Sequence, residues 1–214
     1  MPADSSGYYG CYCLLDLDSG DSHINFDGNM LAVGGELDWT PELHVTLRGK
    51  EVPRVVLGRG SQAFGFIPDD VFRHVKILLE EGWGCRAFSA LSIFNKLEDS
   101  YSAEVAIICY APDHEAELSK FAQLMQKRIA KGEHPAVKLS PKELERVLAA
   151  GGAWADTKEA PKPKLGKMEA LYKTKQTSTE RAALAAVEGN KGCYIGLIAC
   201  AVVLIAAIWF FFFR

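Results

Sequence analysis

The chain has 214 residues, of which 49% are hydrophobic and 24% charged, and its formal net charge is −3. A chain of this length and composition can fold into one domain with a full apolar core. The same values exclude a disordered chain, a disulfide-dense miniprotein and a transporter with many membrane spans.

Short strands are predicted for the first third of the chain, where apolar runs alternate with polar turns. They cover residues 10–17, 24–33, 43–47, 52–57 and 62–67. The third and fourth runs flank an Arg-Gly-Lys-Glu turn, an arrangement typical of a hairpin.

A helix is predicted over residues 69–81, because apolar side chains recur there at helical spacing and Gly82 follows as a stop signal. Two longer strands are predicted next, over residues 83–94 and 103–110, with a polar turn between them.

Two further helices complete the predicted domain. The first has Pro112 in its first turn and ends before Gly132. The second opens with Ser140-Pro-Lys-Glu143, which has the spacing of a capping box, and ends at Gly151. This order of elements predicts an α+β fold with a small, mainly antiparallel sheet and two or three helices.

The balance of basic and acidic residues changes after this domain. Residues 1–152 carry 15 basic and 22 acidic side chains, whereas residues 153–192 carry 8 and 5. Prolines alternate with lysines just after the boundary, which is typical of a solvated, semi-stiff linker. We therefore expect an α+β domain over residues 1–152 and a basic linker over residues 153–192. Helix-forming residues at 168–188 predict a juxtamembrane helix within that linker.

Residues 193–213 form an uninterrupted apolar run, which as a helix would span about 31 Å and match a bilayer core. Tyr194 and Trp209 fit the aromatic belts at the two interfaces, and Lys191 and Arg214 flank the run. Basic residues gather on its N-terminal side, so the positive-inside rule predicts a cytosolic N-terminal domain. We expect a single-pass, tail-anchored membrane protein.

No motif nominates a catalytic or metal site, so the catalytic residues are unknown and neither a metal nor a cofactor is expected. Cys85 and Cys109 are interpreted as small buried hydrophobic residues in a reducing compartment, since no Cys-x-x-Cys pair is present. The five histidines are scattered, without a neighbouring acidic partner. The Asp-rich segment from Asp16 to Asp27 misses the calcium-loop register and is better explained as a polar turn.

Residues 54–110 run through a strand, Gly65-Phe66-Ile67-Pro68, a helix and two further strands. This order resembles the HIRAN family, small β-rich modules that recognise single-stranded DNA ends. The resemblance implies that Phe64, Phe66 and Pro68 lie beside a nucleotide pocket and that Arg59 contacts a phosphate.

The alternative interpretation of this segment is structural. On it, the two phenylalanines belong to the core and Pro68 starts the helix. The family's upstream stretch of paired Asn and Asp residues is absent here, where residues 48–57 stand instead. The net acidic charge of the domain also disfavours a nucleic-acid partner, because phosphate contacts dominate such affinity.

Three functions follow from these observations. The leading hypothesis is a membrane-anchored interaction module whose cytosolic domain binds a protein or peptide partner. The alternatives are a HIRAN-like module that binds nucleic-acid ends, and a membrane-anchored enzyme with dispersed catalytic residues.

Overall fold

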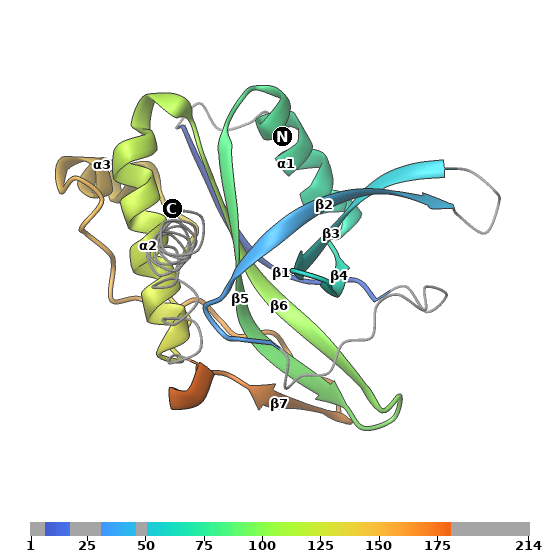
Figure 1. Ribbon diagram of the computed structural model, residues 1–214. Coiled ribbons are helices and arrows are strands. Elements are labelled where there is room, and N and C mark those ends of the chain that lie inside the picture. The colour runs from blue at the N-terminus through green and yellow to red at the C-terminus, as the bar shows by residue number, and fades with distance from the viewer. Residues whose placement is uncertain (1–6, 18–30, 46–50, 181–214) are drawn as a thin grey trace, which may run out of the picture. The chain divides into compact units, whose positions relative to one another are not determined.

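The computed structural model describes residues 7–17, 31–45 and 51–180 (Figure 1). The chain divides into two compact units, Met1–Gln176 and Thr177–Arg214. Within the described residues the fold is α+β, with seven antiparallel strands, three α-helices and one short 3₁₀ helix, as the sequence predicts in outline.

The elements follow one another along the first unit. They are β1 (Tyr8–Leu14), β2 (Glu36–Val45), β3 (Glu51–Arg59), β4 (Gln62–Phe66), α1 (Asp69–Glu80), β5 (Gly84–Asn95), β6 (Ser100–Tyr110), the 3₁₀ helix η1 (Pro112–His114), α2 (Glu115–Ala130), α3 (Pro141–Ala149) and β7 (Glu169–Lys173). The predicted strand at 24–33 differs: residues 31–33 are not in a strand, and residues 24–30 lie outside the described part.

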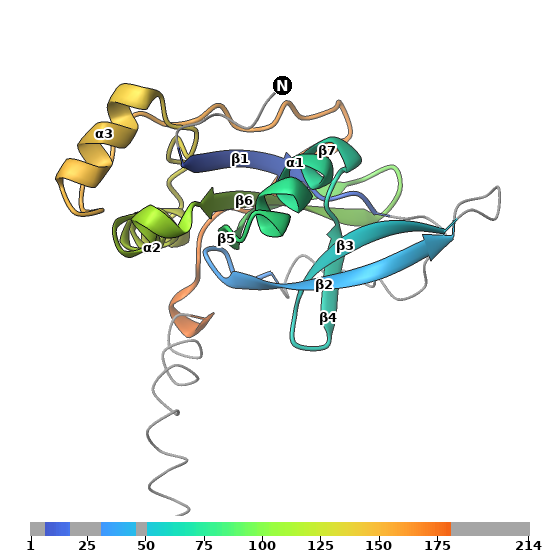
Figure 2. The same ribbon diagram turned by 90° about the horizontal axis from the view of Figure 1, so that it is seen from above.

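The strands form one sheet in the order β1-β6-β5-β2-β3-β4, and β7 is added to β5 off this path. Two strands, β2 and β7, pair with different parts of the same edge of β5. β2 pairs with it only at Phe88 and Ala87. Beyond that point β2 leaves to form a long hairpin with β3 (Figures 1 and 2). The same edge of β5 then accepts β7. At the far end the backbones of Asp16 and Phe66 exchange two hydrogen bonds of 2.9 Å, so the sheet curls until β4 meets the chain after β1.

Helices cover both faces of the β5–β6 hairpin, with α2 on one side and α1 on the other (Figures 1 and 2). Side chains alternate along β6, so Ala106 and Ile108 point toward α2, whereas Val105 and Ile107 belong to the core beneath α1. This explains why β6 is an almost continuous apolar run in the sequence: both of its faces are buried.

The helix boundaries follow local signals. Pro68 is the N-cap residue of α1. The side chain of Ser140 accepts a hydrogen bond from the backbone N–H of Glu143, whose carboxylate accepts one from the N–H of Ser140, so the predicted capping box of α3 is formed. Gly132 follows α2 with a φ of 93°, which glycine adopts readily.

The predicted domain boundary after residue 152 and the linker beyond it require correction. The first compact unit continues to Gln176, and β7 lies inside the predicted linker and pairs with β5. Residues 168–176, expected to start a helix, contain this strand instead. Helical residues begin at 178, after a second capping box in which Thr177 and Glu180 exchange hydrogen bonds.

Hydrogen bonds fix the backbone of this predicted linker to the domain at several points. Ala136 N–H donates to the carbonyl of Lys158, Ala160 N–H to that of His134, and Lys96 N–H to that of Met168. Residues 153–167 thus run from α3 to β7, behind the sheet in the view of Figure 1 (Figures 1 and 2). We call this segment the strap. The Pro- and Lys-rich composition of residues 153–167 predicts exposure, and most of their side chains are indeed exposed. Their backbone, in contrast, is hydrogen-bonded to the domain.

Candidate functional site

The four residues that the HIRAN resemblance singles out are brought into one region but not onto one surface. Phe64 and Phe66 are almost completely buried, at 2% and 1% exposure, and Phe64 is part of the core beneath α1. Arg59 and Pro68 are half-buried, at the end of β3 and at the N-cap of α1. Neither aromatic ring is therefore presented for stacking on a base.

The surroundings of Phe66 explain its burial. The guanidinium of Arg54 lies 5.3 Å from the centre of the Phe66 ring, and its Nε lies 4.0 Å from a carboxylate oxygen of Asp69. The backbone N–H and carbonyl of Phe66 are both hydrogen-bonded to the backbone of Asp16. Burial raises the pKa of Asp16, and the charge of Arg54 opposes this effect. The segment joins β4 to the chain after β1 and so closes the curled sheet.

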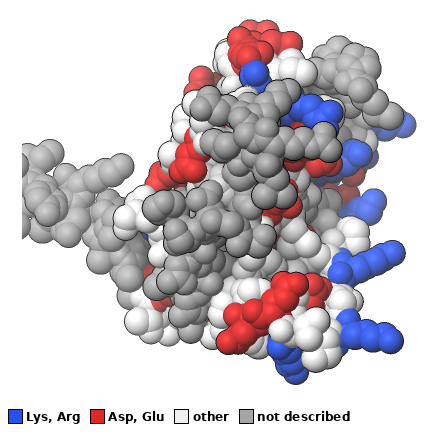
Figure 3. Space-filling model, turned by 90° about the vertical axis from the view of Figure 1, so that its right-hand side faces the viewer, with Lys and Arg blue, Asp and Glu red and all other residues white. Residues whose placement is uncertain are grey.

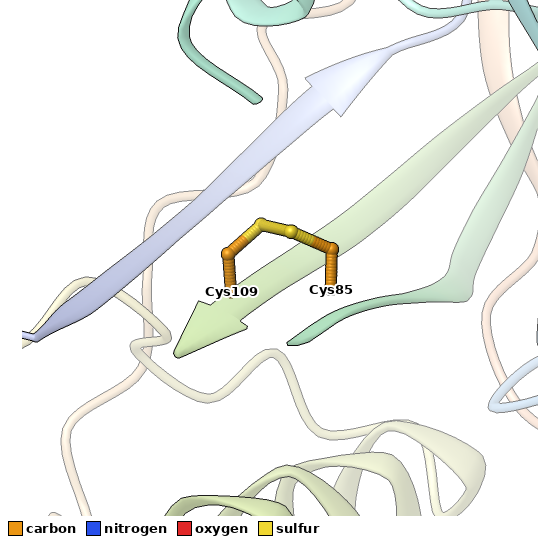
Figure 4. The surroundings of a disulfide bond; sticks show 2 residues. All are labelled: Cys85 and Cys109. Atoms are coloured by element: carbon orange, nitrogen blue, oxygen red, sulfur yellow. A yellow bond between two sulfur atoms is a disulfide. The ribbon is translucent and has the colours of Figure 1, made fainter. Parts of the chain in front are cut away.

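A second group of reactive side chains lies on the face of the sheet beneath α1. Cys85 and Cys109 are directly opposite each other on β5 and β6 and form a disulfide (Figure 4). The interpretation of these two residues as unpaired small hydrophobic residues is therefore wrong. Cys11 and Cys13 on β1 are partly buried against the same core and are free thiols.

The chemistry of these two thiols is restrained by their surroundings. Burial, more than any other cause, raises the pKa of both the Cys11 and Cys13 thiols, and the charge of Asp70 adds to the effect. Tyr9, on the same strand, stacks on His74 of α1 with ring centres 6.2 Å apart. Because the thiolate is the reactive form, both thiols are poor nucleophiles near neutral pH.

A buried histidine–carboxylate contact lies in the interior of the domain and was not predicted. His134 Nε2 lies 2.8 Å from a carboxylate oxygen of Glu104, and both side chains are buried. His134 Nδ1 lies 3.0 Å from the carbonyl oxygen of Ala160, and Tyr12 stacks on the imidazole with ring centres 4.1 Å apart. The expectation that each histidine lacks an acidic partner is therefore wrong for His134.

The pKa of His134 is raised although burial by itself lowers it. The hydrogen bond to Glu104, the one to the carbonyl of Ala160 and the negative charge of Glu104 together outweigh burial. Both ring nitrogens face oxygen acceptors, so the protonated ring can donate to both of them and neither nitrogen is directed at a substrate. This pair therefore fastens the strap to the sheet and does not resemble a catalytic dyad.

The outer side of α1 carries exposed apolar and acidic side chains. Ile77, at 50% exposure, and Leu79 are large apolar side chains on this short amphipathic helix that face solvent. Asp69 and Asp70 occupy its first turn. Because they are two residues apart on the helix, Ile77 and Leu79 lie on different sides of α1 and do not form one apolar patch.

The remaining predicted features are answered only in part. Lys191, Tyr194, Trp209 and Arg214, expected at the membrane interfaces, lie outside the described residues. In the part of the chain that is described, no helix is long and apolar enough to cross a membrane. Within those same ranges, no three His, Cys, Asp or Glu side chains are placed to hold a metal ion.

No protein-family model matches the chain, and no curated protein or solved structure matches it significantly. The resemblance to HIRAN modules therefore remains a prediction.

Proposed function

We propose that the protein is a single-pass membrane protein whose α+β domain, residues 7–176, binds a protein partner at the membrane surface through the outer side of α1. The observation that carries the membrane part is the apolar run of residues 193–213, which has the length of a bilayer span and no charged side chain. Basic residues precede this run, which favours a cytosolic domain.

The partner-binding part is supported by α1. The helix is anchored in the core by Val75 and Leu78, so its backbone is fixed while Ile77, which is 50% exposed, projects into solvent. Apolar side chains presented by a fixed backbone lose little entropy on binding, and they favour association with a complementary surface.

One observation favours the opposite orientation of the domain. Disulfides are rare in cytosolic proteins, and the domain contains the Cys85–Cys109 bond. Orientation is decided by adding protease to sealed membrane vesicles with the cytosolic side outward. A cytosolic domain is digested, whereas a domain in the lumen is protected until detergent is added.

Membrane anchoring is tested by extraction of the full chain with alkaline carbonate. We expect the full chain to stay in the membrane pellet and a chain lacking residues 193–214 to appear in the supernatant. Recovery of the intact full chain in the supernatant would disprove the anchor.

Partner binding is tested with a photo-reactive amino acid at residue 77 in cells. We expect a discrete cross-linked product from this position and none from the matched exposed position Glu145 on α3. Equal cross-linking from both positions, or none from either, would show that α1 is not a specific contact surface.

A further inference from the structure

The end of the domain that carries β7 exposes a second group of apolar side chains, at the opposite end from α1 (Figure 1). The turn between β5 and β6 meets β7 there, since Lys96 N–H donates to the carbonyl of Met168 at 2.9 Å. Leu97 in the turn is 76% exposed and Met168 is 48% exposed. The other exposed large apolar side chains of this end are Leu165, Leu171 and Tyr172. We call these five residues and the lysines beside them the β7 end.

Lysines are interleaved with these apolar side chains. Exposed lysines at this end are Lys96, Lys164, Lys167 and Lys175. Three acidic residues lie among them: Glu98 and Asp99 in the turn, and Glu169, whose carboxylate accepts a hydrogen bond from Gly166 N–H at 2.7 Å. Figure 3 shows acidic and basic side chains next to one another at the lower end of the visible face.

This surface is held in place by the fold. β7 pairs with β5, and the ring of Tyr172 packs edge-on against Tyr101, with ring centres 4.9 Å apart. After β7, Gln176 N–H donates to the carbonyl of Ala130 at the end of α2. The apolar and basic side chains are therefore presented by a fixed backbone at the last part of the domain before the predicted membrane span.

We infer that the β7 end docks on the surface of an anionic lipid leaflet, an inference that rests on the proposed membrane anchoring. Lysines next to exposed Leu, Met and Tyr side chains match the chemistry of such a surface, where phosphates attract the charges and the apolar groups enter the headgroup boundary. The four exposed lysines outnumber the three carboxylates of this end, those of Glu98, Asp99 and Glu169.

The chain itself favours lipid over a soluble occupant. Residues 177–192 separate Gln176 from the apolar run. They reach at most about 60 Å when fully extended and about 25 Å when helical. Such a tether keeps the β7 end near the leaflet at high effective concentration, so even weak contacts with lipid are occupied. No comparable constraint acts on a protein partner.

The inference is tested by hydrogen–deuterium exchange on the full chain reconstituted in vesicles of phosphatidylcholine alone or with phosphatidylserine. We expect exchange of backbone amides at residues 96–99 and 164–168 to slow by about tenfold in the anionic vesicles, while exchange in α1 is unchanged. The double variant Lys164→Glu, Lys167→Glu should abolish this protection. The matched variant Lys120→Glu, Lys142→Glu, which reverses exposed lysines on α2 and α3, should keep it.

The possible outcomes test the docking on lipid and the membrane anchor separately. Extraction of the reconstituted chain by alkaline carbonate would disprove the anchor. A chain that resists extraction but exchanges equally in both lipids would overturn docking while the anchor stands. Protection that appears in native membranes but not in purified anionic vesicles would also overturn the inference, in favour of a protein occupant.

Discussion

Removal of the strap and β7 is the most direct test of the domain boundary. We compare a chain ending at Gly152, the boundary that charge and composition predict, with one ending at Gln176, where the first compact unit ends. The shorter chain lacks β7, the strap and Trp154, which packs against the core beside α2. We expect the shorter chain to be much less stable.

The magnitude follows from the contacts that are lost. Apart from the pairing of β7 with β5 and the local bond from Ala153 N–H to the carbonyl of Ala150, six hydrogen bonds join residues 153–176 to the rest of the domain. Their partners are Arg128 with Asp156, Ala136 with Lys158, His134 with Ala160 twice, Lys96 with Met168, and Ala130 with Gln176. At about 0.5–1.5 kcal/mol each they contribute roughly 3–9 kcal/mol, and the pairing of β7 and the burial of Trp154 act with them against the entropy of ordering the segment. We expect a net loss of about 4 kcal/mol, which is a large share of the 5–15 kcal/mol typical of a domain.

The assay is urea denaturation followed by far-ultraviolet circular dichroism, because this signal does not depend on the tryptophan that is removed. The chain ending at Gln176 should unfold in one cooperative transition, and the chain ending at Gly152 at a clearly lower urea concentration or without a transition. Equal midpoints for the two chains would refute the assignment of the strap and β7 to the domain.

Three further predictions concern particular contacts. Because the pKa of His134 is raised in the folded state, the stability that its protonated ring provides is complete below its unfolded pKa of about 6.5 and is lost as pH rises through the higher folded pKa. Urea midpoints should thus fall with rising pH, and Glu104→Gln should remove that dependence and cost about 1–3 kcal/mol; an unchanged pH profile would contradict the pairing. Reduction of the Cys85–Cys109 bond, which has a sequence separation of 24, should cost about 3.5 kcal/mol, and peptide mapping without reductant should recover the two cysteines linked, not separately alkylated. Ser140→Ala should lower the thermal stability by about 1 kcal/mol in calorimetry, while Ser140→Asp should leave it nearly unchanged.

Most helices and strands are predictable because their signals are local. The capping box at Ser140, the apolar spacing of residues 69–81 and the turn between β5 and β6 each lie within a few residues, and the structure has an element at each. β7 carries no such signal. Its Glu-Ala-Leu-Tyr-Lys sequence favours a helix, and it becomes a strand because the edge of β5 beyond Phe88 is open to pairing.

The disulfide shows why the candidate sites were harder to predict than the elements. Near the turn, Phe94 faces Tyr101, and this register extended without a break would place Cys85 opposite Tyr110. A bulge between Ser89 and Leu91 shifts the pairing by one residue, so that Cys85 faces Cys109. Periodicity alone does not locate a bulge. Glu104 is different, because a single carboxylate within an apolar strand is a signal that a buried partner exists, although it does not identify His134.

The charge pattern of the sequence acquires another meaning once the strap belongs to the domain. Residues 153–176 add six basic and three acidic side chains to the same compact unit as the acidic residues 1–152. The lysines of this segment then lie around β7, among Glu98, Asp99 and Glu169, at the opposite end from the acidic first turn of α1. An anionic surface exerts a torque on such a body and favours the orientation with β7 toward the lipid. That orientation turns the outer side of α1 away from the lipid, so the proposed docking on lipid and the proposed binding of a partner use different ends of the domain and do not compete.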